Sequence, residues 1–149
     1  MSVIAWDGRR LSADNQLSSE SGVMCQGIKI RRGRGGVLLG WVGHQSVGLG
    51  MARWYDNGAK TSNFPDCSCS AVNDSTALIV VLPDASVWCY EHTPEPIRVA
   101  EKVCAWGSGG DIALGALLAG AKSRRAAEIA CQVVNDCGFG VRSLLLGRK

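Results

Sequence analysis

Short apolar runs separated by turn residues dominate the first part of the chain. Val3–Trp6 is apolar and ends at Asp7 and Gly8, a dipeptide typical of hairpin turns. Arg9–Ala13 is therefore expected to be the return strand, with Asp14 at its end. The pattern predicts a β-hairpin at the start of the chain.

A second pair of strands follows after a polar loop. Gln26–Arg32 alternates between apolar and polar residues, which places Ile28 and Ile30 on one face and Lys29 on the other. A glycine-rich turn then leads into the apolar strand Val37–Val42. We therefore interpret the first 43 residues as two consecutive hairpins.

The pattern changes to a helical period after this strand. In Gln45–Asn57, the apolar residues Val47, Met51 and Trp54 fall at positions i, i+4 and i+7. Gly58 is a typical residue to end a helix. A long loop follows, and two strands are then expected at Thr76–Leu82 and Ser86–Glu91, with a further short strand within Val99–Trp106.

The last part of the chain predicts two helices and a final strand. Gly107–Gly110 precedes the helix Ile112–Ala119, and Ser123 is a suitable N-cap for the helix Arg124–Val134. Val141–Leu146 is the final strand. Because the strands and helices come in runs of each type, the order predicts an α+β fold. Several strands are apolar on both faces, which indicates a sandwich with helices on its outer faces.

Length and composition fit one domain over residues 1–149. Apolar residues make up 46% of the chain and charged residues 19%, which is typical of a globular protein. The net charge of +3 does not favour nucleic-acid or membrane binding. The longest apolar runs are far shorter than the ~20 residues of a membrane helix. The N-terminus lacks the pattern of a secretory signal, so we expect a cytoplasmic protein with reduced cysteines.

Three alternative binding sites are weakly supported. Cys67 and Cys69 are too close for a C-x-x-C pair, and neither His44 nor His92 has a zinc-finger spacing from them. Gly107–Gly110 lacks the lysine of a phosphate-binding loop. The arginine- and glycine-rich segment Arg31–Gly36, between the two strands of the second predicted hairpin, resembles an RNA-binding segment, but a solvated hairpin is favoured. We expect no metal and no cofactor.

Ser2 is the candidate nucleophile. Removal of Met1 would place a hydroxyl and a free α-amine on one residue, so the nucleophile would carry its own base. An α-amine titrates near ~7.7–8 and can therefore accept a proton at neutral pH.

Three stretches in order resemble one family. They are SVIAWDGRRLSADNQ, GIKIRRGRGGVLLGWVG and AWGSGGDIALGALLAG. Together they resemble the β-type subunits of proteasomes, and most of all HslV and the small proteasome homologues of bacteria and phages. The resemblance covers most of the chain. It implies an N-terminal nucleophile (Ntn) hydrolase with a four-layer αββα sandwich.

The resemblance also implies the site residues. The family's nucleophilic threonine matches Ser2, its acidic residue at the end of the second strand matches Asp14, and its lysine matches Lys29. The glycine whose N–H group stabilises the oxyanion matches Gly43, and the serine of the late G-S-G stretch matches Ser108.

Each matched residue would have a physical role in the reaction of Ser2. Asp14 would pair with Lys29 and keep it charged beside Ser2. Ser108 would orient the α-amine, and the N–H group of Gly43 would stabilise the tetrahedral oxyanion.

The chain departs from the family in two places. It has serine where the family usually has threonine, and its later acidic and serine positions are ambiguous. Asp136 and Cys137 are the nearest candidates for those positions.

The leading hypothesis is a cytoplasmic, self-compartmentalising peptidase. The resemblance implies homo-oligomeric stacked rings, a peptide or unfolded-protein substrate and a partner AAA+ unfoldase. The competing hypothesis is an inactive scaffold or assembly protein of the same fold that retains Met1. A third is a monomeric or dimeric hydrolase of small amides.

Overall fold

The computed structural model describes residues 2–18, 21–66 and 76–147. Two antiparallel sheets account for most of its strands. The four-stranded sheet has the order β10 (Cys104–Trp106), β1 (Ile4–Trp6), β2 (Arg10–Asp14), β11 (Val141–Leu145). The five-stranded sheet has the order β5 (Ile30–Arg32), β6 (Leu38–Val42), β7 (Ala77–Val81), β8 (Val87–Tyr90), β9 (Ile97–Val99).

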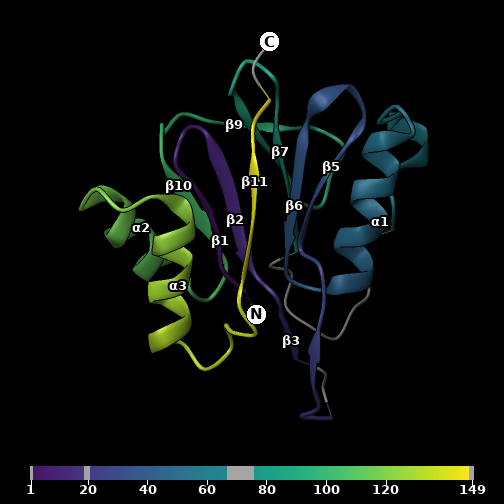
Figure 1. The fold of residues 1–149 in the computed structure, drawn as a ribbon. Helices are drawn as coiled ribbons and strands as arrows, with labels where there is room; N and C mark the ends of the chain where they lie inside the picture. Colours follow the sequence, from purple (N-terminus) through teal and green to yellow (C-terminus); the bar gives the residue numbers. More distant parts are fainter. Residues whose placement is uncertain (1, 19–20, 67–75, 148–149) are drawn as a thin grey trace.

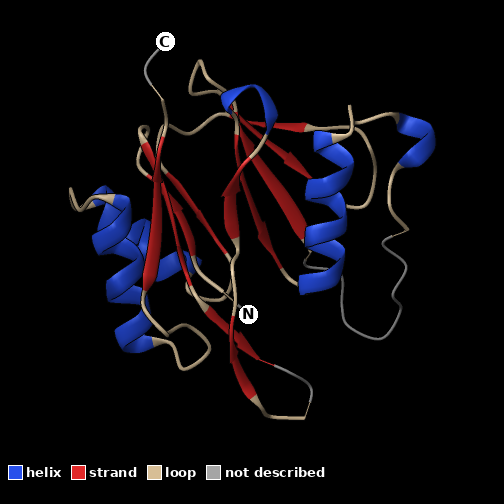
Figure 2. Ribbon diagram, turned by 45° about the vertical axis from the view of Figure 1, so that its right-hand side comes forward, coloured by secondary structure: helices blue, strands red, loops and turns tan. Residues whose placement is uncertain are grey.

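The helices pack against the sheets on opposite sides of the molecule. α2 (Gly110–Leu118) and α3 (Ser123–Val133) lie on the four-stranded sheet, and α1 (Gln45–Asp56) lies on the five-stranded sheet (Figure 1). The turned view in Figure 2 shows the same arrangement, with the two sheets between the helices. The α+β prediction is therefore confirmed.

The strands are apolar on both faces because each face covers a different core. Ile4 and Trp6 pack between the two sheets, whereas Val3 and Ala5 pack against α2 and α3. The five-stranded sheet alternates in the same way, with Ile79 between the sheets and its neighbours in β7 facing α1. This alternation explains the apolar runs that the sequence shows.

Most predicted elements are present within one or two residues of their expected ends. The first hairpin pairs Ile4 with Ala13, and α1 buries Val47, Met51 and Trp54 as its spacing predicted. Gly58 follows the helix with φ +98°, the left-handed backbone conformation that suits a glycine stop.

The prediction for the segment between the two hairpins was wrong. A short additional hairpin, β3 (Gln16–Ser18) with β4 (Met24–Gln26), is formed by the two ends of the expected polar loop and the residues next to them. The expected strand Gln26–Arg32 is broken, because only its two ends are strands.

The cap of α3 also differs from the prediction. Ser123 is the first residue of the helix and not its cap, and its hydroxyl lies 2.9 Å from that of Ser12. The Ser123 N–H group instead donates to the carboxylate of Asp7, at 2.9 Å. Asp7 also accepts N–H groups from Arg9 and Arg10, so one side chain closes the first hairpin and caps a distant helix.

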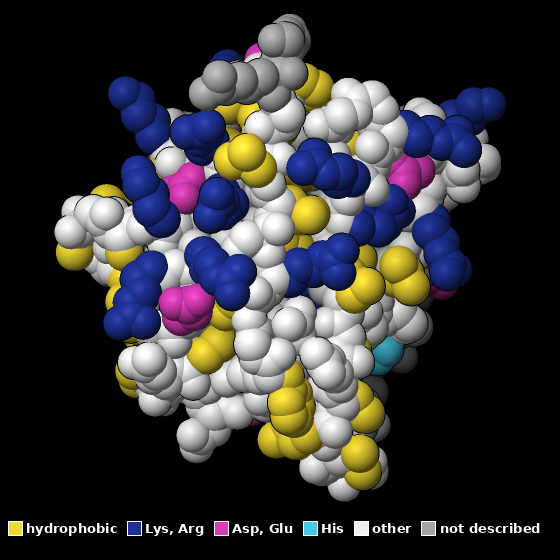
Figure 3. All heavy atoms as spheres, viewed as in Figure 1, with side chains coloured by type: hydrophobic (Ala, Val, Ile, Leu, Met, Phe, Trp, Pro, Cys, Tyr) yellow, Lys and Arg dark blue, Asp and Glu magenta, His cyan; other side chains and the backbone are white. Residues whose placement is uncertain are grey.

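The surface is chemically uneven on the face that carries β11 and β5. Lys and Arg side chains are spread over most of this face, and hydrophobic side chains gather at its lower end (Figure 3). The β3–β4 hairpin lies at that end and exposes Val23 and Met24. Within the described residues, no helix is long and apolar enough to cross a bilayer.

Candidate active site

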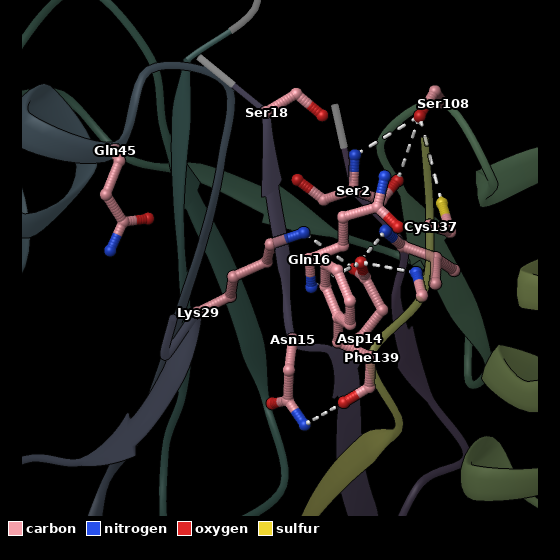
Figure 4. A network of polar contacts seen from close by, with 12 residues as sticks. Ser2, Asp14, Asn15, Gln16, Ser18, Lys29, Gln45, Ser108, Cys137 and Phe139 are labelled. Atoms are coloured by element: carbon pink, nitrogen blue, oxygen red, sulfur yellow. Dashed lines mark hydrogen bonds and ion pairs between the residues drawn. The ribbon is translucent and has the colours of Figure 1, made fainter. Parts of the chain in front are cut away.

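Asp14 is the centre of a buried polar network at the end of β2. Its side chain has no exposed surface and accepts four hydrogen bonds. The Lys29 ammonium and the N–H group of Val3 donate to one carboxylate oxygen, at 2.8 and 2.9 Å. The N–H groups of Gln16 and Gly138 donate to the other, at 3.1 and 3.2 Å (Figure 4). One carboxylate therefore joins four segments of the chain.

Lys29 reaches this carboxylate because the chain leaves the extended pattern just before it. The alternation predicted that Lys29 and Ile30 lie on opposite faces of a strand. Both are buried, however, and Lys29 is only 2% exposed. Ile28 is 47% exposed instead. The Lys29–Asp14 ion pair is thus enclosed on both sides, and the burial of each charge is offset by the other.

Ser2 lies beside this network at the start of the four-stranded sheet. Only 2% of its surface is exposed. Its N–H group donates to the hydroxyl of Ser108 at 3.2 Å, and the N–H group of Gly109 donates to its carbonyl oxygen at 3.1 Å. The Ser108 hydroxyl also lies 3.4 Å from that carbonyl oxygen. The turn between β10 and α2 therefore holds both backbone polar atoms of Ser2 (Figure 4).

This close approach depends on a glycine. Gly107 has φ +90°, and a Cβ atom there would collide with the carbonyl oxygen of Ser2. A larger residue would push the turn away from Ser2, so only glycine allows the observed contacts.

A cavity of about 530 Å³ opens next to Ser2. Its lining residues come from the ends of both large sheets and from the turn after β10. They are Ser2, Val42, Gly43, Thr76, Ala77, Cys89, Glu91, Trp106, Gly107 and Ser108.

Gly43 forms part of the cavity wall directly after β6. It has φ +86°, and a Cβ atom there would lie 2.5 Å from Cα of Thr76. The Thr76 hydroxyl accepts the N–H group of His44 at 2.9 Å, which fixes the chain on either side of this contact. The glycine thus stays close to β7 in a conformation that other residues rarely adopt.

Comparison of the whole structure with known proteins defines the fold. No protein-family model and no curated protein matches the sequence. The structure is similar to BPH of Thiobacillus denitrificans in complex with epoxomicin, with a TM-score of 0.71, 18% identity and coverage of 99% of this chain and 100% of that one. It is equally similar to HslV of Trypanosoma brucei, with a TM-score of 0.71, 18% identity and 99% coverage of both chains. A mutant Anbu of Hyphomicrobium sp. strain MC1 gives a TM-score of 0.72 at 10% identity, over 97% of this chain and 81% of that one.

The chain has a proteasome-like Ntn-hydrolase fold. The resemblance noted in three sequence stretches is thereby confirmed at the level of the fold. Within this proteasome-like fold, Ser2, Asp14, Lys29 and Ser108 lie in or beside one hydrogen-bonded network, and Gly43 shares a cavity wall with Ser2. Their catalytic roles stay predictions. Met1, on whose removal those roles depend, lies outside the described residues.

Asp136 and Cys137 are the candidates for the family's later acidic and serine positions. The Cys137 thiol is 4% exposed and lies 3.9 Å from the Ser108 hydroxyl, whereas Asp136 is partly exposed. Burial and the negative charge of Asp14 raise the pKa of the Cys137 thiol, with the Ser108 hydroxyl acting in the opposite direction. The thiol is therefore neutral at physiological pH and packs against Ser108 as a small, weakly polar group.

Two further residues of the site were not singled out from the sequence. Gly138 donates its N–H group to Asp14, and no local pattern marks that contact. Glu91 lines the cavity, and the alternation of β8 could have found it, because Glu91 continues the spacing of Val87 and Cys89 one residue past the end of the strand.

Across residues 2–18, 21–66 and 76–147, no three His, Cys, Asp or Glu side chains are grouped as metal ligands. Cys67 and Cys69 lie outside the described residues.

Proposed function

We propose that the chain is the subunit of a self-compartmentalising peptidase whose nucleophile is the hydroxyl of Ser2 after removal of Met1. The observation that carries this proposal is the enclosure of Ser2 between the turn after β10, the Asp14 network and a cavity of substrate size. It is supported by the proteasome-like fold. In that fold we further propose a single four-layer αββα domain over residues 1–149.

The proposed reaction begins with proton transfer within one residue. The free α-amine of Ser2 takes the proton of the Ser2 hydroxyl, and the oxygen attacks the carbonyl carbon of the scissile peptide bond. The contact with Ser108, at 3.2 Å from the Ser2 nitrogen, orients the amine. The Lys29 ammonium, held by Asp14, favours the developing negative charge on the hydroxyl oxygen.

The second half of the reaction releases the two products. The carbonyl oxygen becomes an oxyanion that the Gly43 N–H group stabilises, a contribution worth roughly 3–4 kcal/mol in comparable sites. The protonated amine gives its proton to the leaving nitrogen, and the peptide bond breaks to leave an ester on Ser2. A water molecule then hydrolyses the ester with the same amine as base, which restores the hydroxyl.

The assembly belongs to the same proposal. The structure is similar to those of BPH and HslV. We propose that this chain forms stacked rings in the cytoplasm, with Ser2 facing an inner chamber. An AAA+ unfoldase would supply unfolded protein to that chamber.

The state of residue 1 and the reactivity of Ser2 test the proposal together. We expect each subunit of the assembled protein to have the mass of the chain without Met1. Incubation with epoxomicin, the compound bound to BPH of Thiobacillus denitrificans, should raise that mass by one molecule of epoxomicin per subunit. Ser2→Ala should abolish labelling and lower peptide hydrolysis by at least about a thousandfold, because it removes the nucleophile. Ser62→Ala, at an exposed serine far along the chain, is the matched control and should change neither.

The competing hypotheses give different results in the same experiment. An inactive scaffold would assemble with Met1 retained, without labelling and without peptide hydrolysis. A small-amide hydrolase would label at Ser2 but remain a monomer or dimer in light scattering. Retention of Met1 in fully assembled protein would rule out the Ser2 nucleophile.

A further inference from the structure

The cavity beside Ser2 is the open end of the core between the two sheets. Trp106 and Ser2 form its wall on the four-stranded side. Val42 and Ala77 form the wall on the five-stranded side, and both belong to the apolar core between the sheets. A molecule bound at Ser2 would therefore have a largely apolar recess next to the reacting atoms.

Glu91 is the charged residue among the described residues of this wall. Val87 and Cys89 are 3% and 7% exposed and point between the sheets. Glu91 follows Cys89 by two residues, so the alternation of β8 carries its carboxylate to the same side. The strand ends at Tyr90, and Glu91 is exposed, which places the carboxylate at the open end of the apolar recess.

The negative charge of Glu91 is not neutralised from within the described chain. No Lys, Arg or His is among the residues that line the cavity. The ion pairs found among the described residues do not include Glu91. Burial and the charge of Glu91 raise the pKa of the neighbouring Cys89 thiol to about 11, so that thiol stays neutral at physiological pH. Among the described residues that line the cavity, Glu91 is therefore the only one with a charged side chain.

This combination matches the shape and charge of a basic side chain. Lysine and arginine have an apolar stem and a charged head, and they bury the stem while the head stays near water. The walls formed by Val42, Ala77 and Trp106 suit the stem, and Glu91 at the open end suits the head. A volume of about 530 Å³ is large enough for one such side chain.

We propose that this cavity binds a lysine or arginine side chain of the substrate close to the scissile bond, with Glu91 as the residue that selects it. The inference rests on the proposed peptidase function and names its substrate class. Glu91 contacts substrate in this proposal and takes no part in bond cleavage.

The test compares substrates that differ by one charge. A series of internally quenched peptides carries lysine, in turn, at each of three positions on either side of the scissile bond. A matched series carries norleucine, which has a stem of the same length without the ammonium group. Each peptide is cleaved by the assembled protein, and kcat/KM is measured at low and high salt.

We expect lysine to be preferred over norleucine at one position by about tenfold, equivalent to about 1.4 kcal/mol. Salt should weaken the preference, because an exposed charge pair is screened. Glu91→Gln should abolish it, so that the ratio of kcat/KM between the lysine and norleucine peptides falls to about one. Glu91→Lys should reverse it in favour of a glutamate peptide. Glu95→Gln, at an exposed glutamate in the same loop region, is the matched control and should retain the lysine preference.

The outcomes separate this inference from the proposed function. Equal cleavage of lysine and norleucine peptides at every position, or a lysine preference that survives Glu91→Gln, overturns the inference while the peptidase function stands. Absence of any cleavage together with absence of epoxomicin labelling overturns both.

Discussion

At the scale of single residues, the charge of Asp14 has the largest structural consequence. Its four hydrogen bonds come from Lys29 and from three backbone N–H groups in separate segments. Removing one member of a buried ion pair leaves the other uncompensated in a region of low dielectric constant. The pair should therefore matter more to stability than any ion pair on the surface.

Asp14→Asn is expected to lower the free energy of unfolding by about 3–5 kcal/mol, because it removes the negative charge that faces the buried Lys29 ammonium. Urea denaturation gives the value. Glu128→Gln breaks a helix-surface pair whose Arg124 side chain is 54% exposed, and it should cost at most about 0.5 kcal/mol.

The single variant Lys29→Met and the double variant Asp14→Asn with Lys29→Met complete a double-mutant cycle for this ion pair. The double variant should be less destabilised than the sum of the two single variants, because no charge is then left buried. Additive effects would show that the two side chains are not energetically coupled.

The sequence could predict which residues meet at this site but not how they are enclosed. The resemblance identified Asp14 and Lys29, whereas alternation alone placed Lys29 on the face opposite Ile30. Both are buried, because the chain breaks its extended pattern between β4 and β5. Such a break depends on contacts with distant segments, such as the backbone bond from Trp41 to Lys29, which a local pattern does not contain.

At the scale of elements, the cap of α3 also depends on a distant contact that the local sequence pattern does not contain. A serine before an apolar helical face is a good local cap signal, yet here the N–H group of Ser123 is satisfied by Asp7 from the first hairpin. The strands were predictable because their apolar runs reflect two cores. The β3–β4 hairpin was not, because its strands are short and largely exposed.

The carboxylate of Asp7 should make α3 sensitive to acid. Burial raises the pKa of Asp7, but the hydrogen bonds from the N–H groups of Ser123, Arg10 and Arg9 together lower it by more. The pKa therefore lies below its ordinary value of 3.8. Because the folded-state pKa is depressed, the stabilisation is fully present above pH 3.8 and is lost as the pH falls through the folded-state value.

Asp7→Asn is therefore expected to cost about 1 kcal/mol at pH 7 through the weakened cap. The difference from the unmodified protein should shrink as the pH is lowered from 4 to 2. Chemical denaturation of both proteins at several pH values measures the difference. A gap that stays constant over this range would show that the charge of Asp7 contributes nothing to the cap.

At the scale of the whole molecule, a group of hydrophobic side chains lies at the lower end of the face in Figure 3, below most of its Lys and Arg side chains. Val23 and Met24 are 57% and 51% exposed on the β3–β4 hairpin, which extends past the ends of both sheets (Figure 1). In the proposed rings, such a projecting apolar hairpin is well placed to contact a second copy of the chain.

The combined variant Val23→Asp with Met24→Asp is expected to sediment as smaller species than the unmodified protein, because it would bury charge in a subunit contact. Sedimentation velocity measures the change, and circular dichroism establishes that the variant is folded. An unmodified protein that sediments as a monomer would contradict the ring proposal, and an unchanged assembly would place the contact elsewhere.

The position of Ser2 has a practical consequence for anyone who modifies this protein. β1 is an inner strand, paired with β10 on one side and β2 on the other, and the residues before it are held by Asp14 and Gly109. Residues 2 and 3 therefore have little freedom to swing outward, and a segment fused ahead of Ser2 starts at the cavity wall. Such a segment would compete with substrate for the same space. An affinity tag belongs at the C-terminus, and a cleavable N-terminal extension would serve as a built-in inhibitor.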